Sequence, residues 1–100
     1  MAVLRSEASV GTMVPDRYLA QLCRQLSEEV PATYSARTGR AEFGFGHCSL
    51  KTARHALMLV VEAEDETSLA RVQHIVSTYL ERSMWRERPT INWIRTSDRA

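Results

Sequence analysis

The sequence predicts an α+β fold, a two-layer sandwich in which two helices pack on one face of a mostly antiparallel sheet. In two separated segments the apolar residues recur with a helical period, whereas in the remaining segments they alternate as in strands. The strand segments between the helices are short and closely spaced, which favours antiparallel hairpins. Each helical segment has a single apolar stripe, so both helices are expected on the same sheet face. The predicted order is strand, helix, four strands, helix, strand.

The chain begins with a predicted strand at residues 6–12 and a predicted helix at residues 15–29. In the strand, three residues alternate with more polar or smaller ones: Ala8, Val10 and Thr12. Pro15 suits the first helical position, and Pro31 ends the helix. The apolar stripe of the helix consists of Tyr18, Leu19, Leu22, Cys23, Leu26 and Val30.

Four short strands are expected next, at residues 32–37, 40–45, 47–51 and 55–63. A turn is expected at Thr38 and Gly39, between the first two of them. In the last strand both alternating sets are mostly apolar, namely Leu57, Leu59 and Val61 against Met58, Val60 and Glu62. A strand that is apolar on both faces is expected at the centre of the sheet.

The second helix is expected at residues 66–83, with Asp65 as its N-terminal cap. Its buried stripe consists of Leu69, Val72, Ile75, Val76, Tyr79 and Leu80. Pro89 marks a break after this helix. The last strand is expected at residues 90–95, where Trp93 alternates in phase with Ile91.

The segment AEFGFGHCSL, residues 41–50, is interpreted as a bend between two strands. Gly44 and Gly46 flank Phe45, where a bulge or tight reversal uses the conformational freedom of glycine. A phosphate-binding loop would need glycines that open a helix, followed by Lys and Ser or Thr. Here the glycines are followed by another strand, in which Cys48 and Leu50 share one face.

Length and composition restrict the class of protein. The length of 100 residues predicts a single domain, residues 1–100. The net charge of +1 argues against a general nucleic-acid binder, which would normally be clearly basic. No apolar run approaches the roughly 20 residues that span a bilayer, so no membrane contact is expected. The first ten residues lack the apolar core of an export signal. We therefore expect a cytoplasmic protein whose two cysteines are thiols in a reducing compartment.

No catalytic set, metal site or cofactor is expected from motifs. Cys23 and Cys48 are each in phase with apolar neighbours, which predicts inert buried thiols. The three histidines have no metal-ligand spacing, and the sequence has no nucleophile or phosphate-loop motif. A group of arginines near the C-terminus is best interpreted as a mixed, solvated surface: Arg82, Arg86, Arg88, Arg95 and Arg99. The alternative is an anion or interface site that includes Arg82, Arg86, Trp85 and Trp93. For Trp93, which alternates with Ile91, a core role is an equally good interpretation.

Four segments carry a resemblance to a known family: RYLAQLCRQL, EFGFGHCSL, SLARVQHIVSTYLERSMWRE and INW. Over residues 6–95 the chain resembles domain of unknown function family 2218, a family of small bacterial proteins. It departs from the family pattern at Gln25, Glu28 and Tyr79, where many members carry His, and at Leu26 and Ser83, where many carry Phe. Some relatives are fused to, or encoded near, siderophore-interacting flavin reductases. The resemblance therefore implies an accessory role in bacterial iron or siderophore handling.

Two classes of function are weighed. The first is a non-enzymatic binding or adaptor domain. The second is a small enzyme or ligand-binding domain with a pocket between the two helices and the strand of Cys48; its candidate residues are Cys23, Gln25, Glu28, Cys48 and Tyr79. The absence of a visible nucleophile–base or metal constellation favours the first.

The sheet face away from the helices is expected to carry large apolar side chains, either Met58 and Val60 or the opposite phase of the same strand, Leu57, Leu59 and Val61, together with Ile94. A contiguous apolar patch on a soluble protein usually marks an interface. We therefore expect a second copy of the chain or a partner domain to cover this face, with a weak homodimer as the simplest case.

Overall fold

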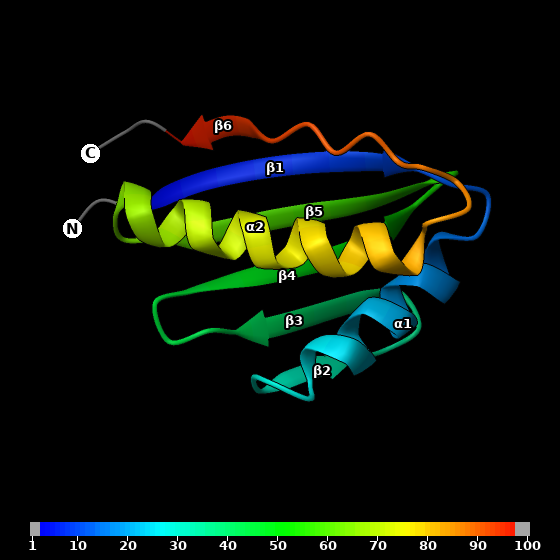
Figure 1. Cartoon of the computed structure of the whole chain (residues 1–100), viewed down its shortest axis with the longest axis horizontal. Coiled ribbons are helices and arrows are strands. Elements are labelled where there is room, and N and C mark those ends of the chain that lie inside the picture. Colours follow the sequence, from blue (N-terminus) through cyan, green and yellow to red (C-terminus); the bar gives the residue numbers. More distant parts are fainter. Residues whose placement is uncertain (1–2, 98–100) are drawn as a thin grey trace.

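The computed structural model describes residues 3–97 and has two helices on one face of a six-stranded sheet (Figure 1). The elements in chain order are β1 (Leu4–Gly11), α1 (Pro15–Leu26), β2 (Ala32–Tyr34), β3 (Thr38–Glu42), β4 (Gly46–Ala53), β5 (Ala56–Ala63), α2 (Glu66–Ser83) and β6 (Ile94–Ser97). The strands lie in the order β2-β3-β4-β5-β1-β6, and every neighbouring pair is antiparallel. This confirms the predicted fold class and element order.

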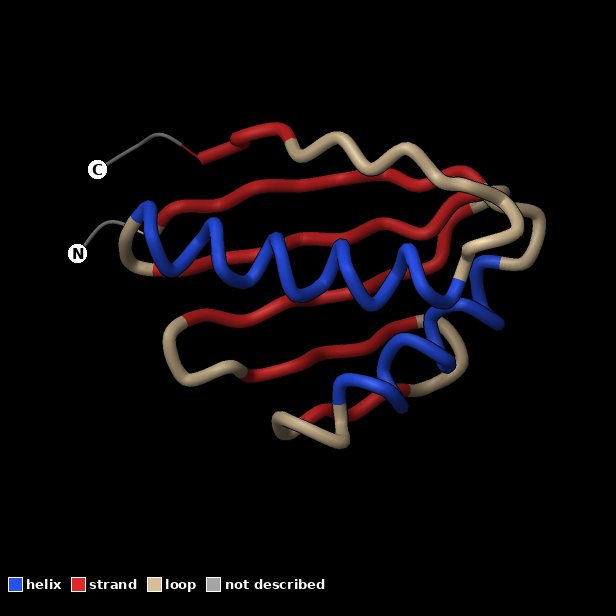
Figure 2. The backbone as a smooth tube through the Cα atoms, viewed as in Figure 1, coloured by secondary structure: helices blue, strands red, loops and turns tan. Residues whose placement is uncertain are grey.

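The two helices cover the sheet in different places. The backbone trace in Figure 2 shows α2 running along the central strands, while α1 crosses the part of the sheet that contains β2 and β3. Strand β5 lies between β4 and β1, the central position that its two apolar faces predict. Leu57, Leu59 and Val61 of β5 are fully buried against the helices. The core stripes predicted for both helices are buried or half-buried, as expected.

Helix α1 ends at Leu26, three residues before the predicted end at residue 29. Beyond it the backbone tightens, because the N–H groups of Glu28 and Glu29 donate to carbonyls three residues back. Pro31 disfavours helical geometry in the residue before it, which explains why the helix does not continue. Helix α2 has the predicted bounds, and the Asp65 carboxylate accepts a hydrogen bond from the Ser68 N–H at 2.7 Å.

The prediction of a turn at Thr38 and Gly39 is wrong, because both residues lie in β3. The chain reverses two residues earlier, at Ala36 and Arg37, where the Ser35 N–H donates to the Thr38 carbonyl at 2.8 Å. Gly39 is needed for packing and not for a turn. A Cβ built on it would lie 2.6 Å from the Cys23 Sγ atom of α1.

Strand β6 begins at Ile94, four residues later than predicted. Trp93 provides the physical reason, since its indole N–H donates to the Ser77 hydroxyl of α2 at 2.8 Å. Side-chain contacts with the helix and core thus hold the segment before β6, in place of strand pairing.

The bend predicted within residues 41–50 is confirmed between β3 and β4. Gly44 has a φ of 87°, the left-handed conformation that favours glycine, and the Phe43 N–H donates to the Gly46 carbonyl at 2.8 Å. The rings of Phe43 and Phe45 have centroids 6.0 Å apart and pack against the edge of the core.

The open face of the sheet is more polar than expected. Met58 and Val60 are half-buried there, and their partners on the neighbouring strands are all polar: Ser9 and Lys51 beside Met58, Glu7 and Ser49 beside Val60. Ile94, paired with Glu7, is 64% exposed. Glu7 separates Val60 from Ile94, whereas Met58 and Val60 are neighbours along β5 with polar residues on both adjacent strands. The apolar area on this face is therefore narrower than expected.

Candidate functional site

The two cysteines come together in the core. Cys23 of α1 and Cys48 of β4 are both fully buried, and both are free thiols. Burial raises the pKa of Cys23 to about 11. Burial also raises the pKa of Cys48, with a further contribution from the nearby Cys23. Both thiols are therefore protonated at neutral pH and are poor nucleophiles, as their apolar phase predicts.

The three other residues of the predicted pocket lie nearer the surface. The Gln25 amide oxygen accepts a hydrogen bond from the Ser83 hydroxyl of α2 at 3.3 Å, so it joins the two helices. Glu28 is exposed in the turn after α1. Tyr79 is half-buried and packs against the edge of the core. The structure thus brings Cys23 and Cys48 together but does not gather all five residues around one cavity.

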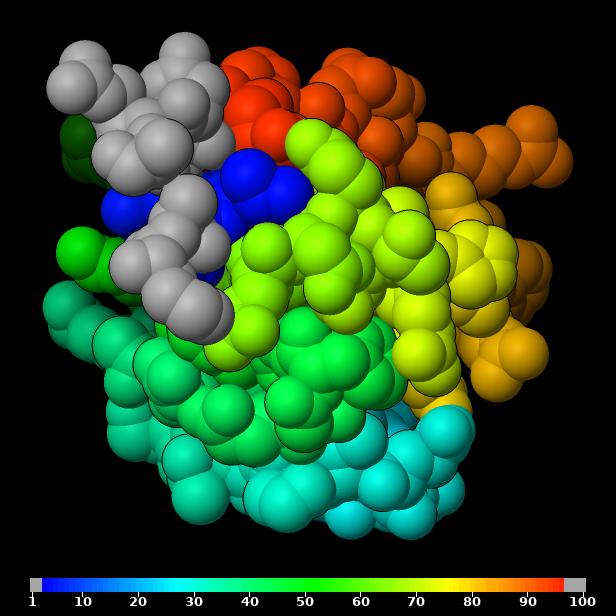
Figure 3. Space-filling view, turned by 90° about the vertical axis from the view of Figure 1, so that its left-hand side faces the viewer, coloured from blue at the N-terminus to red at the C-terminus, as the bar shows by residue number. Residues whose placement is uncertain are grey.

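A small apolar groove does lie between the two helices. It has a volume of about 180 Å³ and is lined by Leu26, Glu29, Val30, Phe43, Phe45, Arg71, Ile75 and Tyr79. Figure 3 shows the end of the molecule where the residues that follow α1 (cyan), the β3–β4 turn (green) and α2 (yellow) meet. Of the predicted pocket residues, only Tyr79 lines this groove. The missed signal is the spacing of Arg71, Ile75 and Tyr79, which puts them on one face of α2.

The arginines near the C-terminus do not form one cluster. Arg95 donates to the Glu66 carboxylate at the beginning of α2, with Nη1 3.1 Å from Oε2. Arg82 lies in the last turn of the same helix, about 24 Å along its axis from Glu66. Arg99 lies outside the described residues. Arg95 and Arg82 therefore lie at opposite ends of α2. The candidate anion or interface site at Arg82, Arg86, Trp85 and Trp93 stays a prediction.

The surface beyond the end of α2 is dominated by Trp85. Its side chain is 65% exposed, and the guanidinium carbon of Arg86 lies 4.9 Å from its ring centroid. The turn that carries it is anchored on both sides, since Met84 is fully buried and the Tyr18 hydroxyl donates to the Glu87 carboxylate at 2.7 Å. That hydrogen bond raises the pKa of Tyr18. Trp93, in contrast, is half-buried against Ser77.

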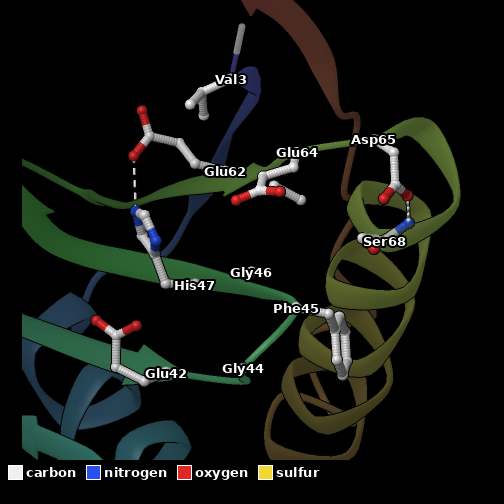
Figure 4. Close-up of a pocket in the computed structure, with 11 residues that line it drawn as sticks. Val3, Glu42, Gly44, Phe45, Gly46, His47, Glu62, Glu64, Asp65 and Ser68 are labelled. Atoms are coloured by element: carbon white, nitrogen blue, oxygen red, sulfur yellow. Dashed lines mark hydrogen bonds and ion pairs between the residues drawn. The ribbon is translucent and has the colours of Figure 1, made fainter. Parts of the chain in front are cut away.

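An acidic cleft at the opposite end of α2 was also missed by sequence reasoning (Figure 4). It has a volume of about 410 Å³, and its lining includes Glu42, His47, Glu62, Glu64 and Asp65. The His47 Nε2 atom lies 2.6 Å from a Glu62 carboxylate oxygen, and Phe45 points away from this pair, towards α2 (Figure 4). The sequence carries a signal for this pair, because His47 and Glu62 each alternate with the apolar residues of their strand. On two neighbouring strands such residues lie on the same sheet face and can interact.

Within residues 3–97, no three His, Cys, Asp or Glu side chains are arranged to hold a metal ion. None of the described helices is both long and apolar enough to cross a bilayer. A His–carboxylate pair can transfer protons, and apolar grooves and exposed indoles bind other molecules. The geometry therefore presents three chemically different surfaces.

Comparison with known proteins places the chain in a family. Residues 7–94 match the family model described as an uncharacterized protein conserved in bacteria, DUF2218. The NMR structure of PA4090 from Pseudomonas aeruginosa is similar, with 27% sequence identity and a TM-score of 0.76 over 91% of this chain and 95% of that one. No curated protein matches the chain. With its fold and most of its length matched, the chain belongs to the DUF2218 family of uncharacterised bacterial proteins.

Proposed function

We propose that this chain is a non-enzymatic binding domain that contacts a partner protein through the surface around Trp85. The observation that carries the proposal is the exposure of this indole, with Arg86 beside its ring. Trp and Arg are the residue types most enriched among side chains that dominate protein–protein binding energy. A mostly exposed tryptophan contributes little to the stability of its own fold, because most of its apolar area is not buried.

The turn that presents Trp85 is held in a fixed conformation before any partner binds. The N–H groups of Glu87 and Arg88 both donate to the Met84 carbonyl, and Arg88 adopts a left-handed φ of 49°. Glu87 is tied to Tyr18 of α1. A side chain displayed on a preorganised turn loses less conformational entropy on binding, which favours an interface role.

The charges around Trp85 indicate the chemistry of the partner. Residues 81–88 contain three arginines and two glutamates, and one glutamate is already bonded to Tyr18. A complementary surface would offer an apolar pocket for the indole and carboxylates for the arginines. The proposal also includes a cytoplasmic location and an accessory role in iron or siderophore handling. Its first candidate partner is accordingly a siderophore-interacting flavin reductase.

The open sheet face is a second contact surface within this proposal. Met58 and Val60 are half-buried there and Ile94 is exposed, so some apolar area is available to a second copy of the chain. Polar neighbours divide this area, and rigid-body costs offset much of the gain from burying it. We accordingly propose a weak homodimer on this face.

The test of the main proposal is a titration with a purified siderophore-interacting flavin reductase from the same bacterium. The environment of each of the two tryptophans is followed separately, and Trp85→Ala is the disabling variant. Binding that requires Trp85 supports the proposal.

A further inference from the structure

We infer that the groove between α1 and α2 binds a small aromatic carboxylate, with its ring inside the groove and its carboxylate on Arg71. This goes beyond the proposed partner surface, because it assigns a separate site and a small-molecule ligand. The inference depends on the volume of the groove, on its lining and on Arg71, which makes no ion pair with any residue of the described range 3–97.

The volume of the groove sets the size of the ligand. It measures about 180 Å³, whereas an apolar cavity of roughly 150 Å³ in another protein is known to take up benzene. The groove therefore has room for one six-membered ring with a short substituent. Larger ligands would have to extend into solvent.

The lining favours an aromatic ring over an aliphatic chain. Phe43 and Phe45 come from the β3–β4 turn, with their ring planes tilted 45° to each other. Ile75 and Tyr79 lie on the facing side of α2. Two rings at an angle offer both faces and edges, the arrangement in which a third ring packs well. Each of these four side chains is only partly buried, so the protein leaves apolar area for a ligand to cover.

Arg71 provides the positive charge that recognises the carboxylate of the ligand. Its guanidinium carbon lies 4.1 Å from the centroid of Phe45, and both residues line the groove. Within residues 3–97 its side chain makes no ion pair, whereas Arg5, Arg40 and Arg95 each pair with a glutamate. A guanidinium stacked on a ring still presents N–H donors at its edge, and these match a carboxylate.

Glu29 also lines the groove, and its charge opposes an anion. This provides an internal check on the sign of the ligand's charge. If the carboxylate lies near Arg71, removal of the Glu29 charge strengthens binding and removal of the Arg71 charge weakens it. A cationic ligand would show the reverse pattern.

The experiment is a titration of the ¹⁵N-labelled protein with benzoate, followed by NMR. Benzyl alcohol and acetate serve as probes with only the ring or only the charge, and benzylamine as the cationic probe. We expect saturable shifts for benzoate in residues 43–46 and 71–79, and a Kd at least fivefold weaker for benzyl alcohol and for acetate. Arg71→Gln should weaken benzoate binding at least fivefold, and Glu29→Gln should strengthen it. Arg24→Gln, an exposed charge in the last turn of α1, is the matched control and should leave the Kd unchanged.

The spectrum of each variant alone shows whether it is folded, and Ile75→Trp, which fills the groove, gives a second way to abolish binding. Three results would overturn the inference: benzoate shifts that do not saturate or that lie elsewhere, equal binding of acetate and benzoate, or an unchanged Kd in Arg71→Gln. Preferential binding of benzylamine would overturn it as well. None of these results depends on Trp85, so the partner proposal stands or fails separately.

Discussion

Gly39 of β3 lies directly against Cys23 of α1, so closely that a Cβ on the glycine would come within 2.6 Å of the sulfur. We expect Gly39→Ala to destabilise the fold by about 1–3 kcal/mol, the usual cost of overpacking a core. In a Cys23→Ala background the obstacle is absent, so the same substitution should cost less than about 0.5 kcal/mol. Denaturant unfolding of the four proteins of this cycle measures the coupling directly.

Two other glycines provide controls for that cycle. A Cβ on Gly46 would meet the Glu62 backbone carbonyl at 2.7 Å, so Cys23→Ala should not rescue Gly46→Ala. A Cβ on Gly11 would have only the His55 carbonyl nearby, at 3.9 Å, so Gly11→Ala should be neutral or slightly stabilising. Equal costs of Gly39→Ala with and without the Cys23 sulfur would show that helix α1 does not pack on β3 as described.

The buried thiols should react slowly with alkylating reagents. The pKa of Cys23 is raised to about 11 and that of Cys48 is also raised, so almost no thiolate is present at pH 7. We expect iodoacetamide to modify neither cysteine in the native protein on a timescale of minutes, and to modify both in denaturant. Rapid modification of either native thiol, read by mass spectrometry, would contradict the described core.

The raised pKa of Cys23 also predicts a loss of stability at high pH. The folded state keeps this thiol protonated up to about pH 11, whereas its ordinary pKa is 9.0. The resulting stabilisation is fully present below pH 9 and is lost as the pH rises from 9 towards 11. Unfolding curves at pH 8 and pH 10.5 should therefore differ more for the wild-type protein than for Cys23→Ala. An equal loss in both proteins would exclude this thiol as a source of the effect.

The lowered pKa of Asp65 predicts a loss of stability at acidic pH. The hydrogen bond from the Ser68 backbone lowers the pKa of Asp65 below its ordinary value of 3.8. Its charged form therefore stabilises α2 above that ordinary value, and the stabilisation is lost as the pH falls through the lower, folded value. Asp65→Asn retains a capping side chain without the charge. The wild-type protein should be more stable than Asp65→Asn at pH 7, and the difference should shrink as the pH falls below 3.8.

The open sheet face should support weak self-association. Light scattering over a concentration series to the millimolar range should show a reversible rise in mean mass, because Met58 and Val60 keep some exposed apolar area. Val60→Lys should keep the protein monomeric at all concentrations. An unchanging monomeric mass in the wild-type protein would contradict the predicted dimer.

The sequence was informative where a pattern repeats and weak where a single contact decides. The alternation in β5 and the stripe of α2 predicted the central strand and the bounds of the second helix. Gly39 was interpreted as a turn residue, because its actual role depends on the Cys23 sulfur of a distant helix. The start of β6 was misplaced since the indole of Trp93 bonds to Ser77, a contact that no local pattern encodes.

The candidate sites divide in the same way. Cys23 and Cys48 are each in phase with apolar neighbours, which predicted that both are buried. The structure confirms this burial. The groove was missed, because it forms only when the turn at Phe43 and Phe45 meets the face of α2 that carries Arg71. The alternation of Trp93 with Ile91 favoured a core role as much as an interface role, and Trp93 is partly buried against the core. The exposure of Trp85 depends on where the chain turns after α2, which no local pattern encodes.

The most direct test of the partner proposal is a ¹⁹F NMR titration. The protein labelled with 5-fluorotryptophan has two resonances, for Trp85 and Trp93, which Trp85→Phe assigns. A purified siderophore-interacting flavin reductase is added, and Trp93 serves as the internal control. We predict that the Trp85 resonance shifts or broadens while that of Trp93 stays in place, and that Trp85→Ala weakens binding by about 30-fold, equivalent to about 2 kcal/mol. An unchanged Trp85 resonance, or binding that survives Trp85→Ala at full strength, would contradict the proposal.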